Sequence, residues 1–247
     1  MRLLLFRTHI WLGWIVGVQL LLWMASGLVM SFLPIETVRG EHLRAEQPAR
    51  VLPTDGLVAP DALLRNAPMT VDSLTLTHLV DQPVYLLAAG GKPLALLDAR
   101  TGVGLTIDET AAMRIASASY AGTGVAIEAQ RIASGKAVRE FRRDVPAFAV
   151  RFDDADSTIF YVHAISGKIE AVRTDRWRFY DLMWGLHIMD WRSREDFNHP
   201  LLIVAALLGT ITVAGGLVLL LLRLSGRQPK EKAEQGAADK APEGGSC

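Results

Sequence analysis

Three of the six histidines lie where they could do chemistry beside a membrane. His9 directly precedes a long uncharged apolar run, and Gly13 and Gly17 follow at four-residue spacing on the same helix face. Histidine is a common axial ligand of haem iron, and a glycine face would let a flat macrocycle lie close to the backbone. Alternatively, these residues form a small-residue packing face in which His9 hydrogen-bonds lipid headgroups. Both readings remain open at this stage.

His187 and His199 lie just ahead of a second apolar run. Residues 175–191 (DRWRFYDLMWGLHIMDW) hold His187, and their aromatic side chains recur at helical spacing. Asp190 could orient the His187 ring in a haem or metal site, or simply hydrogen-bond a packed histidine. His199 precedes Pro200, which suits the first position of a helix, so His199 could instead cap that helix. Together, His187 and His199 are the second candidate pair of haem ligands.

Two apolar runs must position these histidines: residues 10–33 (IWLGWIVGVQLLLWMASGLVMSFL) and residues 201–222 (LLIVAALLGTITVAGGLVLLLL). Each is long enough to cross a ~30 Å hydrocarbon core as a helix rising 1.5 Å per residue. The first run exceeds the ~7–15 residues of a signal-peptide core, so we expect a retained helix. A processed protein anchored by the second helix alone is the alternative.

The basic residues beside the two runs predict the orientation of the chain. The outer flanks hold six of them, and the flanks of the intervening segment hold four: Arg2, Arg7, Arg223, Arg227, Lys230 and Lys232, against Arg39, Arg44, Arg192 and Arg194. The positive-inside rule therefore predicts both termini in the cytoplasm and an extracytoplasmic insert. The expected order is a cytoplasmic N-terminus (1–9), a span (10–33), an insert (34–172), an interfacial amphipathic helix with its lead-in (173–200), a span (201–222) and a disordered tail (223–247).

Composition excludes several classes of function. The formal net charge is zero, which argues against a nucleic-acid partner. The single cysteine, Cys247, leaves no disulfide, thiolate metal site or cysteine nucleophile within the insert. No hydrolase, phosphate-binding or zinc-protease motif occurs, and the sequence predicts neither catalytic residues nor a metal site. The chain shows no stand-alone catalytic motif.

The insert contains a weak internal repeat. Residues 83–102 and 146–167 both read as a short strand, a turn, a second strand and then the sequence Ala-x-[Thr/Ser]-Gly. His163 stands at the second corner where Asp98 stands at the first, and we interpret it as structural. A helical stretch precedes each hairpin, with Pro60 at a helix start and Asp108 as an N-cap. The expected fold is α+β, with two helix-plus-antiparallel-sheet units at about 58–106 and 107–172.

These features resemble a known family. The two helix-plus-hairpin units are similar to PepSY domains, and residues 7–17 (RTHIWLGWIVG) and 184–191 (WGLHIMDW) look like the PepSY-associated transmembrane family. The resemblance implies a bacterial inner-membrane protein with a periplasmic insert. Larger relatives of about four spans are similar to siderophore-iron reductases that hold b-type haem on membrane histidines, whereas other PepSY domains are thought to bind or restrain peptidases.

Two functions therefore stand at the sequence level. The preferred one is a non-enzymatic accessory or binding protein of the bacterial envelope, held in the lipid bilayer, with a protein or peptide partner in the periplasm. The alternative is a b-haem electron-transfer subunit linked to ferric-siderophore reduction and iron uptake. Two spans are fewer than a reductase of this kind carries, and no dinucleotide-binding glycine motif occurs. A homodimer or a larger membrane complex would fit either function.

Overall fold

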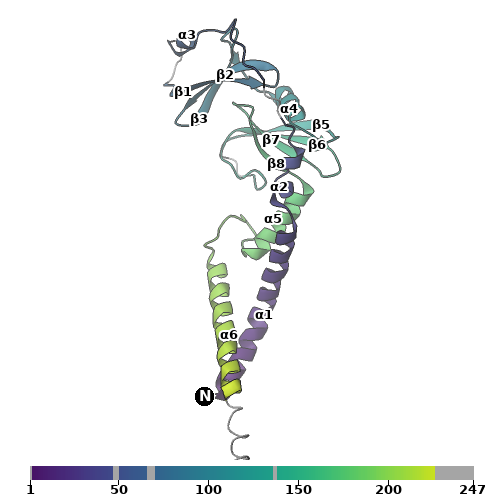
Figure 1. Ribbon diagram of the computed structural model, residues 1–247, viewed down its shortest axis with the longest axis vertical. Helices are drawn as coiled ribbons and strands as arrows, with labels where there is room; N and C mark the ends of the chain where they lie inside the picture. The colour runs from purple at the N-terminus through teal and green to yellow at the C-terminus, as the bar shows by residue number, and fades with distance from the viewer. Residues whose placement is uncertain (1, 47–49, 66–69, 136–137, 226–247) are drawn as a thin grey trace, which may run out of the picture. The chain divides into compact units, whose positions relative to one another are not determined.

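The computed structural model describes residues 2–46, 50–65, 70–135 and 138–225 (Figure 1). It is a mixed helix and sheet structure, as expected, with one long apolar helix near each end. The chain divides into two compact units. One holds residues Ser31–Leu182, and the other holds Met1–Met30 with Met183–Cys247. Most of the tail predicted to be disordered, including Cys247, lies outside the described residues.

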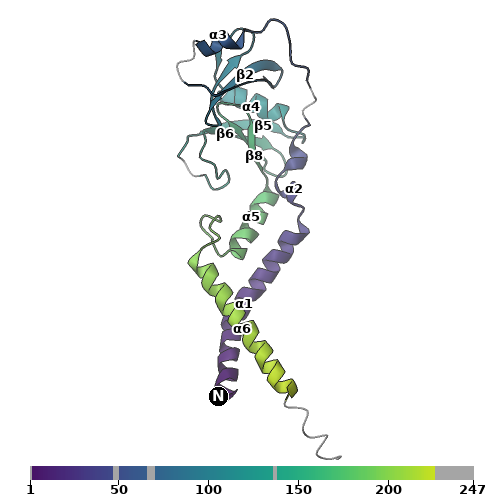
Figure 2. The same ribbon diagram turned by 60° about the vertical axis from the view of Figure 1, so that its left-hand side comes forward.

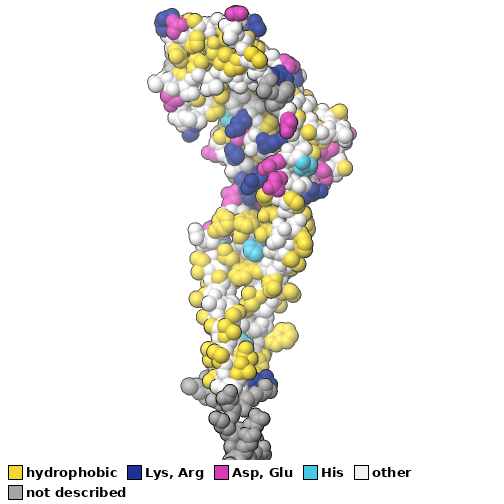
Figure 3. Space-filling model, viewed as in Figure 1, with side chains coloured by type: hydrophobic (Ala, Val, Ile, Leu, Met, Phe, Trp, Pro, Cys, Tyr) yellow, Lys and Arg dark blue, Asp and Glu magenta, His cyan; other side chains and the backbone are white. Residues whose placement is uncertain are grey.

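The two long helices are α1 (Arg2–Phe32) and α6 (Pro200–Ser225). Phe6–Phe32 and Pro200–Ser225 are long and apolar enough to cross a membrane. Figure 3 shows hydrophobic side chains over most of this pair of helices on the face in view. Helix α1 begins eight residues before the predicted 10–33 segment, and α6 continues three residues beyond the predicted 201–222 segment. A run of apolar residues does not show where its helix begins or ends, because polar residues at either end can continue the same helix.

Helices α1 and α6 lie side by side in Figure 1 and cross in Figure 2. They approach closely at Gly209, where an added Cβ would lie 3.7 Å from Leu20 and 3.8 Å from Val16. Val16 and Thr212 are buried. The Thr212 hydroxyl donates to Leu208 O at 2.8 Å, which leaves no polar group of that side chain unsatisfied in the apolar contact. Small residues thus set the helix contact.

The insert unit is built from short elements. Its helices are α2 (Ile35–Val38), the 3-10 helix η1 (Glu41–Leu43), α3 (Pro60–Arg65) and α4 (Glu109–Ala118). The first sheet has the order β1 (Ser73–Leu79), β2 (Gln82–Ala89), β3 (Lys92–Asp98) and β4 (Gly104–Leu105). The second has the order β5 (Val125–Ile132), β6 (Ala147–Asp153), β7 (Ile159–His163) and β8 (Ile169–Arg173). Both are antiparallel meanders, each preceded by a helix.

The two sheets share one hydrophobic core through α4. That core joins Val84 and Leu96 of the first sheet, Ala112 and Ile115 of α4, and the second-sheet residues Phe148, Val150 and Phe160. Asp108 caps α4, since its carboxylate accepts the backbone N–H of Ala111 at 2.7 Å. Each unit alone has a thin core, so joining them around one helix buries more apolar surface than either could. The insert is therefore one compact body rather than two separate units.

The two hairpin corners have the same backbone course. Gly102 and Gly167 have φ of 72° and 70°, a region that glycine adopts without steric cost. At the first corner the Asp98 carboxylate accepts the N–H groups of Arg100 and Thr101, both at 2.8 Å. At the second, His163 Nδ1 accepts those of Ile165 and Ser166 at 3.1 and 3.2 Å. His163 is therefore structural, as the sequence comparison of the corners indicates.

Helix α5 (Asp175–His187) joins the insert to the segment before α6. Its first turns are tied to the connection between β5 and β6 by ion pairs: Arg178 to Glu140 at 2.9 Å, and Arg142 to Asp181. Arg173 lies 4.2 Å from the centre of the Trp177 ring, a cation–π contact. Arg142 and Arg173 thus cover the Trp177 ring of the predicted aromatic stripe, whereas Trp191 at its far end is exposed.

The helix predicted to continue to Trp191 ends at His187, and residues 188–199 form an irregular loop. Met189 and Arg194 have positive φ of 58° and 57°, which helical backbone excludes. Helical spacing of aromatic residues does not reveal this, because the loop is shaped by one carboxylate, described below.

Candidate functional site

His9 packs against glycines of the facing helix α6. A Cβ added to Gly216 would lie 3.2 Å from His9 Cε1, and a Cβ added to Gly215 would lie 3.5 Å from His9 Nδ1. The ring therefore occupies the space that two missing side chains leave. Gly13 and Gly17 do not contact α6: a Cβ added to either would have no atom of the described residues within 4 Å. The groove expected at Gly13 and Gly17 does not receive α6, and the glycines that position His9 are on the opposite helix.

His187 packs against α1 in a similar manner. Its Cε1 lies 3.4 Å from the place of a Cβ on Gly27, and its Nδ1 lies 3.1 Å from Ser26 Oγ. The Ser26 hydroxyl is also 2.7 Å from Leu22 O. A hydroxyl has one proton, so donation to Leu22 O leaves its oxygen to accept from His187 Nδ1–H. This arrangement favours the tautomer whose Nε2 carries a lone pair, the form that ligates iron or another metal.

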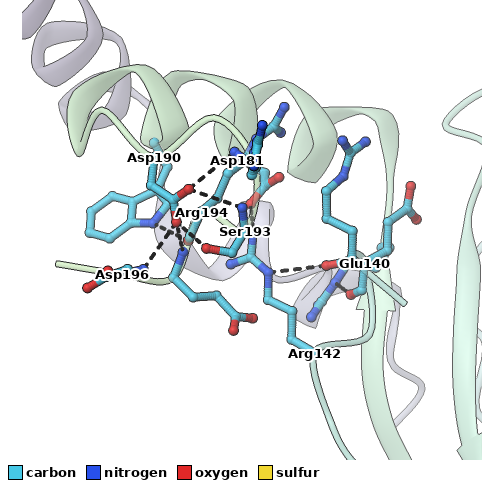
Figure 4. A network of polar contacts seen from close by, with 12 residues as sticks. Glu140, Arg142, Asp181, Asp190, Ser193, Arg194 and Asp196 are labelled. Carbon is cyan, nitrogen blue, oxygen red and sulfur yellow. Dashed lines mark hydrogen bonds and ion pairs between the residues drawn. The ribbon is translucent and has the colours of Figure 1, made fainter. Parts of the chain in front are cut away.

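Asp190 does not orient His187, contrary to that sequence reading. Figure 4 shows its carboxylate at the centre of the loop that follows α5. Oδ1 accepts the N–H groups of Arg192 and Ser193 at 3.2 and 3.1 Å, and Oδ2 accepts those of Glu195 and Asp196 at 3.1 and 3.3 Å. The Ser193 hydroxyl also donates to Oδ2. That hydroxyl, together with the backbone donors, holds the pKa of Asp190 far below its usual range despite burial.

His199 lies at the N-terminus of α6, where its carbonyl accepts the Ile203 N–H at 3.2 Å. This is the backbone bond of a helix N-cap, as the sequence allows. Its ring Nδ1 is buried and has no hydrogen-bond partner among the described residues. Leaving a buried ring nitrogen without a partner costs free energy, so His199 stays a candidate ligand.

The candidate ligands do not form one constellation. His9 and Ser26, the residue that contacts His187, are 17 positions apart on α1, and thus about 25 Å apart along the axis at 1.5 Å per residue. One chain therefore cannot place His9 and His187 on the two faces of one haem. Within the described part of the chain, no group of three or more His, Cys, Asp or Glu side chains could hold a metal ion.

A groove of about 480 Å³ lies between α1 and α6. Leu20 and Trp23 line one wall, and Ala206, Gly209 and Thr210 are among the small residues of the other. The Thr210 hydroxyl donates to Ala206 O at 2.9 Å, which leaves the walls largely apolar. The side chains that line the groove provide no ligand for iron.

Sequence reasoning missed Ser26 and Gly27, the two residues that receive His187. A signal existed, because Ala-Ser-Gly is a short break in a run of large side chains and marks a close approach. What approaches there could not be read from the sequence. Comparison of the chain with protein-family models, with curated proteins and with solved structures finds no match.

Proposed function

We propose that this chain is a PepSY-type accessory or binding protein of the bacterial inner membrane, with both termini in the cytoplasm and the insert in the periplasm. The observation that carries the proposal is the exposed edge of the second sheet. Within the described part of the chain, strand β5 pairs with β6 alone. Its Val125 and Ile127 side chains are 64% and 45% exposed, the latter at a bulge between Ala126 and Glu128.

The bulge determines which side chains this edge exposes. A β-bulge leaves one residue outside the ladder and re-aims its side chain, which here turns Ile127 to solvent beside Val125. An exposed pair of branched apolar side chains on an unpaired edge suits a polypeptide partner, because backbone groups and side chains are both available. A membrane-held protein with such an insert is suited to binding a partner rather than to catalysis.

The proposal is tested by capture from native membranes after mild cross-linking. We expect the full-length protein to recover a defined polypeptide in near-equal amount. The double variant Val125→Asp with Ile127→Asp should lose it, because two carboxylates oppose an apolar contact. A matched variant, Arg100→Asp with Thr101→Asp at the exposed first corner, should retain it. Failure of the unaltered protein to recover any polypeptide above background would remove the main support for this function.

A second candidate, a b-haem electron-transfer subunit, is favoured by two specific observations. The Ser26 contact prepares His187 Nε2 for ligation, and His199 carries a buried ring nitrogen without a partner among the described residues. Haem iron takes two axial ligands, and His9 would need its second ligand from another copy or subunit. Haem would supply one-electron chemistry for ferric-siderophore reduction, while the glycines beside His9 and His187 would hold the rings.

A reduced-minus-oxidised absorption spectrum of the purified protein, with pyridine haemochrome quantitation, tests this candidate. A b-type α-band at near-stoichiometric haem, lost in His187→Ala or His199→Ala, would support it. A colourless, folded protein from cells supplied with haem precursor would exclude it for this chain.

A further inference from the structure

Four strand edges border the two sheets of the insert, and three of them are short, covered or interrupted, so they offer no continuous full-length ladder. Strand β4 has only two residues. Strand β8 is covered, since Ile169 O accepts from Arg44 Nη1 at 3.3 Å and a Cβ on Gly40 would lie 2.6 Å from Val172. Strand β5 is interrupted by its bulge and carries the Glu128–Arg151 ion pair at 2.9 Å, so a partner there would contact mainly the Val125 and Ile127 side chains and would not form a continuous ladder. Short length, cover, bulges and charges are the usual means by which proteins prevent edge-to-edge pairing.

In the ranges that the structure describes, the remaining edge, β1, shows none of these features. Its seven residues (SLTLTHL) carry no formal charge and no proline. They pair with β2 in an unbroken register from Ser73 opposite Ala88 to Leu79 opposite Gln82. Among the described residues β1 pairs with β2 alone. Figure 1 shows it at the outer edge of the first sheet.

The geometry of the β1–β2 hairpin shows which backbone groups of β1 are not hydrogen-bonded to β2. Val80 and Asp81 form a two-residue turn, so the flanking pair Leu79 and Gln82 is hydrogen-bonded. Alternation then points the N–H and C=O groups of Leu74, Leu76 and His78 away from β2. Pro83, opposite His78, agrees with this assignment: it has no N–H, and its carbonyl accepts from Ala99 N at 3.0 Å on the β3 side.

The two faces of β1 show what would complete this edge. Leu74 and Leu76 are half-buried on the face with Tyr85 and Leu87, whereas Ser73, Thr75 and Thr77 are exposed on the other face. An incoming strand should therefore be uncharged, with apolar residues on one face and hydroxyl residues on the other. That is the pattern of β1 itself.

We propose that the β1 edge pairs antiparallel with β1 of a second copy of this chain. Centred on Leu76, this pairing sets Leu76 against its own copy, Leu74 against His78, and Thr75 against Thr77. Odd residues meet odd residues, so the apolar face continues across both sheets and the hydroxyl residues meet on the other face. Cross-strand threonine pairs are favourable, and no like charges face each other. The inference goes beyond partner binding at β5 and does not depend on it.

The test is the mass of the full-length protein in detergent and in nanodiscs over a range of concentrations. The unaltered protein should be dimeric. Thr75→Lys with Thr77→Lys places two lysine pairs in opposition and should raise the dimer dissociation constant about tenfold or more. Thr75→Glu with Thr77→Lys places Glu against Lys at both positions and should restore the dimer. Unchanged thermal unfolding would show that each variant folds.

Several outcomes would overturn the pairing. A monomer at all concentrations would do so, as would a dimer that the double lysine variant leaves intact, since its interface would then lie elsewhere. A monomer whose β1 amides are protected from exchange only in native membranes would indicate a different polypeptide on this edge. Val125→Lys with Ile127→Lys on β5 is the matched control and should remain dimeric. Loss of the partner captured through β5, with the dimer intact, separates the two proposals.

Discussion

At the two corners of the insert, an aspartate and a histidine make the same contacts. Asp98 and His163 each accept two backbone N–H groups from the following turn. The carboxylate accepts at any pH above its pKa, which hydrogen bonds from Gln82 and the turn hold below the usual value. The imidazole accepts at Nδ1 only while that nitrogen is unprotonated. Between about pH 5 and 6.5, the second corner is therefore sensitive to pH and the first is not.

This difference predicts how stability responds to acid. His163 is only 4% exposed, and burial holds its pKa below the ordinary value of 6.5. The unfolded chain then binds a proton more readily than the folded one. The contribution of the corner is complete above about pH 6.5 and is lost as the pH falls from there towards the lowered pKa. His163→Asn keeps a side-chain acceptor that does not titrate. Urea unfolding of the insert between about pH 5 and 7 should show a smaller slope in this variant, and equal slopes would contradict the assignment.

Asp190 gives a second prediction at this scale. Asp190→Asn replaces one acceptor oxygen by an NH₂ group facing N–H donors, and hydrogen bonds to a charged group are worth about 1.5–3 kcal/mol. We expect the loop to open, so that trypsin cleaves rapidly after Arg192 or Arg194. Ser193→Ala removes a single donor and should leave the loop much more resistant. Equal cleavage of both variants would mean that the carboxylate does not organise the loop.

Among the elements, those with a strong local signal were predictable. The two apolar runs, the Pro60 and Asp108 helix starts and the central hairpins β2–β3 and β6–β7 lie where the sequence places them. The flanking strands β1, β4, β5 and β8 were not identified, because half-exposed strands at an edge lack a continuous apolar run. The joining of both sheets around α4 depends on tertiary packing that one sequence does not display.

The candidate site was less predictable than the fold. The sequence identified His9, His187 and His199, but it paired His9 with Gly13 and Gly17 and His187 with Asp190. The structure places Gly215 and Gly216 beside His9, and Ser26 and Gly27 beside His187. Residues near in sequence were assumed to be partners, whereas the actual contacts come from helices that only folding brings together.

The contact between α1 and α6 yields a test with a matched control. Gly216→Leu puts a large side chain where an added Cβ already lies 3.2 Å from the His9 ring. Such overpacking typically costs about 1–3 kcal/mol. Gly17→Leu adds the same atoms where nothing described lies within 4 Å. The midpoint temperature of thermal unfolding, measured on the purified protein in detergent, should fall clearly for Gly216→Leu but not for Gly17→Leu. Greater destabilisation by Gly17→Leu would contradict this helix contact.

For the whole molecule, the compact unit Ser31–Leu182 predicts where the insert can be cut. A fragment of residues 34–182 keeps the first turns of α5, with the Arg178–Glu140 and Arg142–Asp181 ion pairs. A fragment of residues 34–172 loses both and leaves Glu140 without Arg178. We expect the longer fragment to unfold cooperatively in urea and the shorter one to be clearly less stable, because it loses both half-buried ion pairs and the last residue of β8. Equal stability would show that α5 contributes nothing to the insert.

The central claim is that two helices cross the membrane and hold the insert outside the cytoplasm. Labelling of intact cells with a membrane-impermeant maleimide tests it most directly, because Cys247 is the only cysteine of the chain. The unaltered protein should label only after lysis. Val103→Cys in a Cys247→Ser background should label in intact cells, since Val103 is exposed on the insert. Labelling of Cys247 from outside, or protection of position 103 until lysis, would contradict the account.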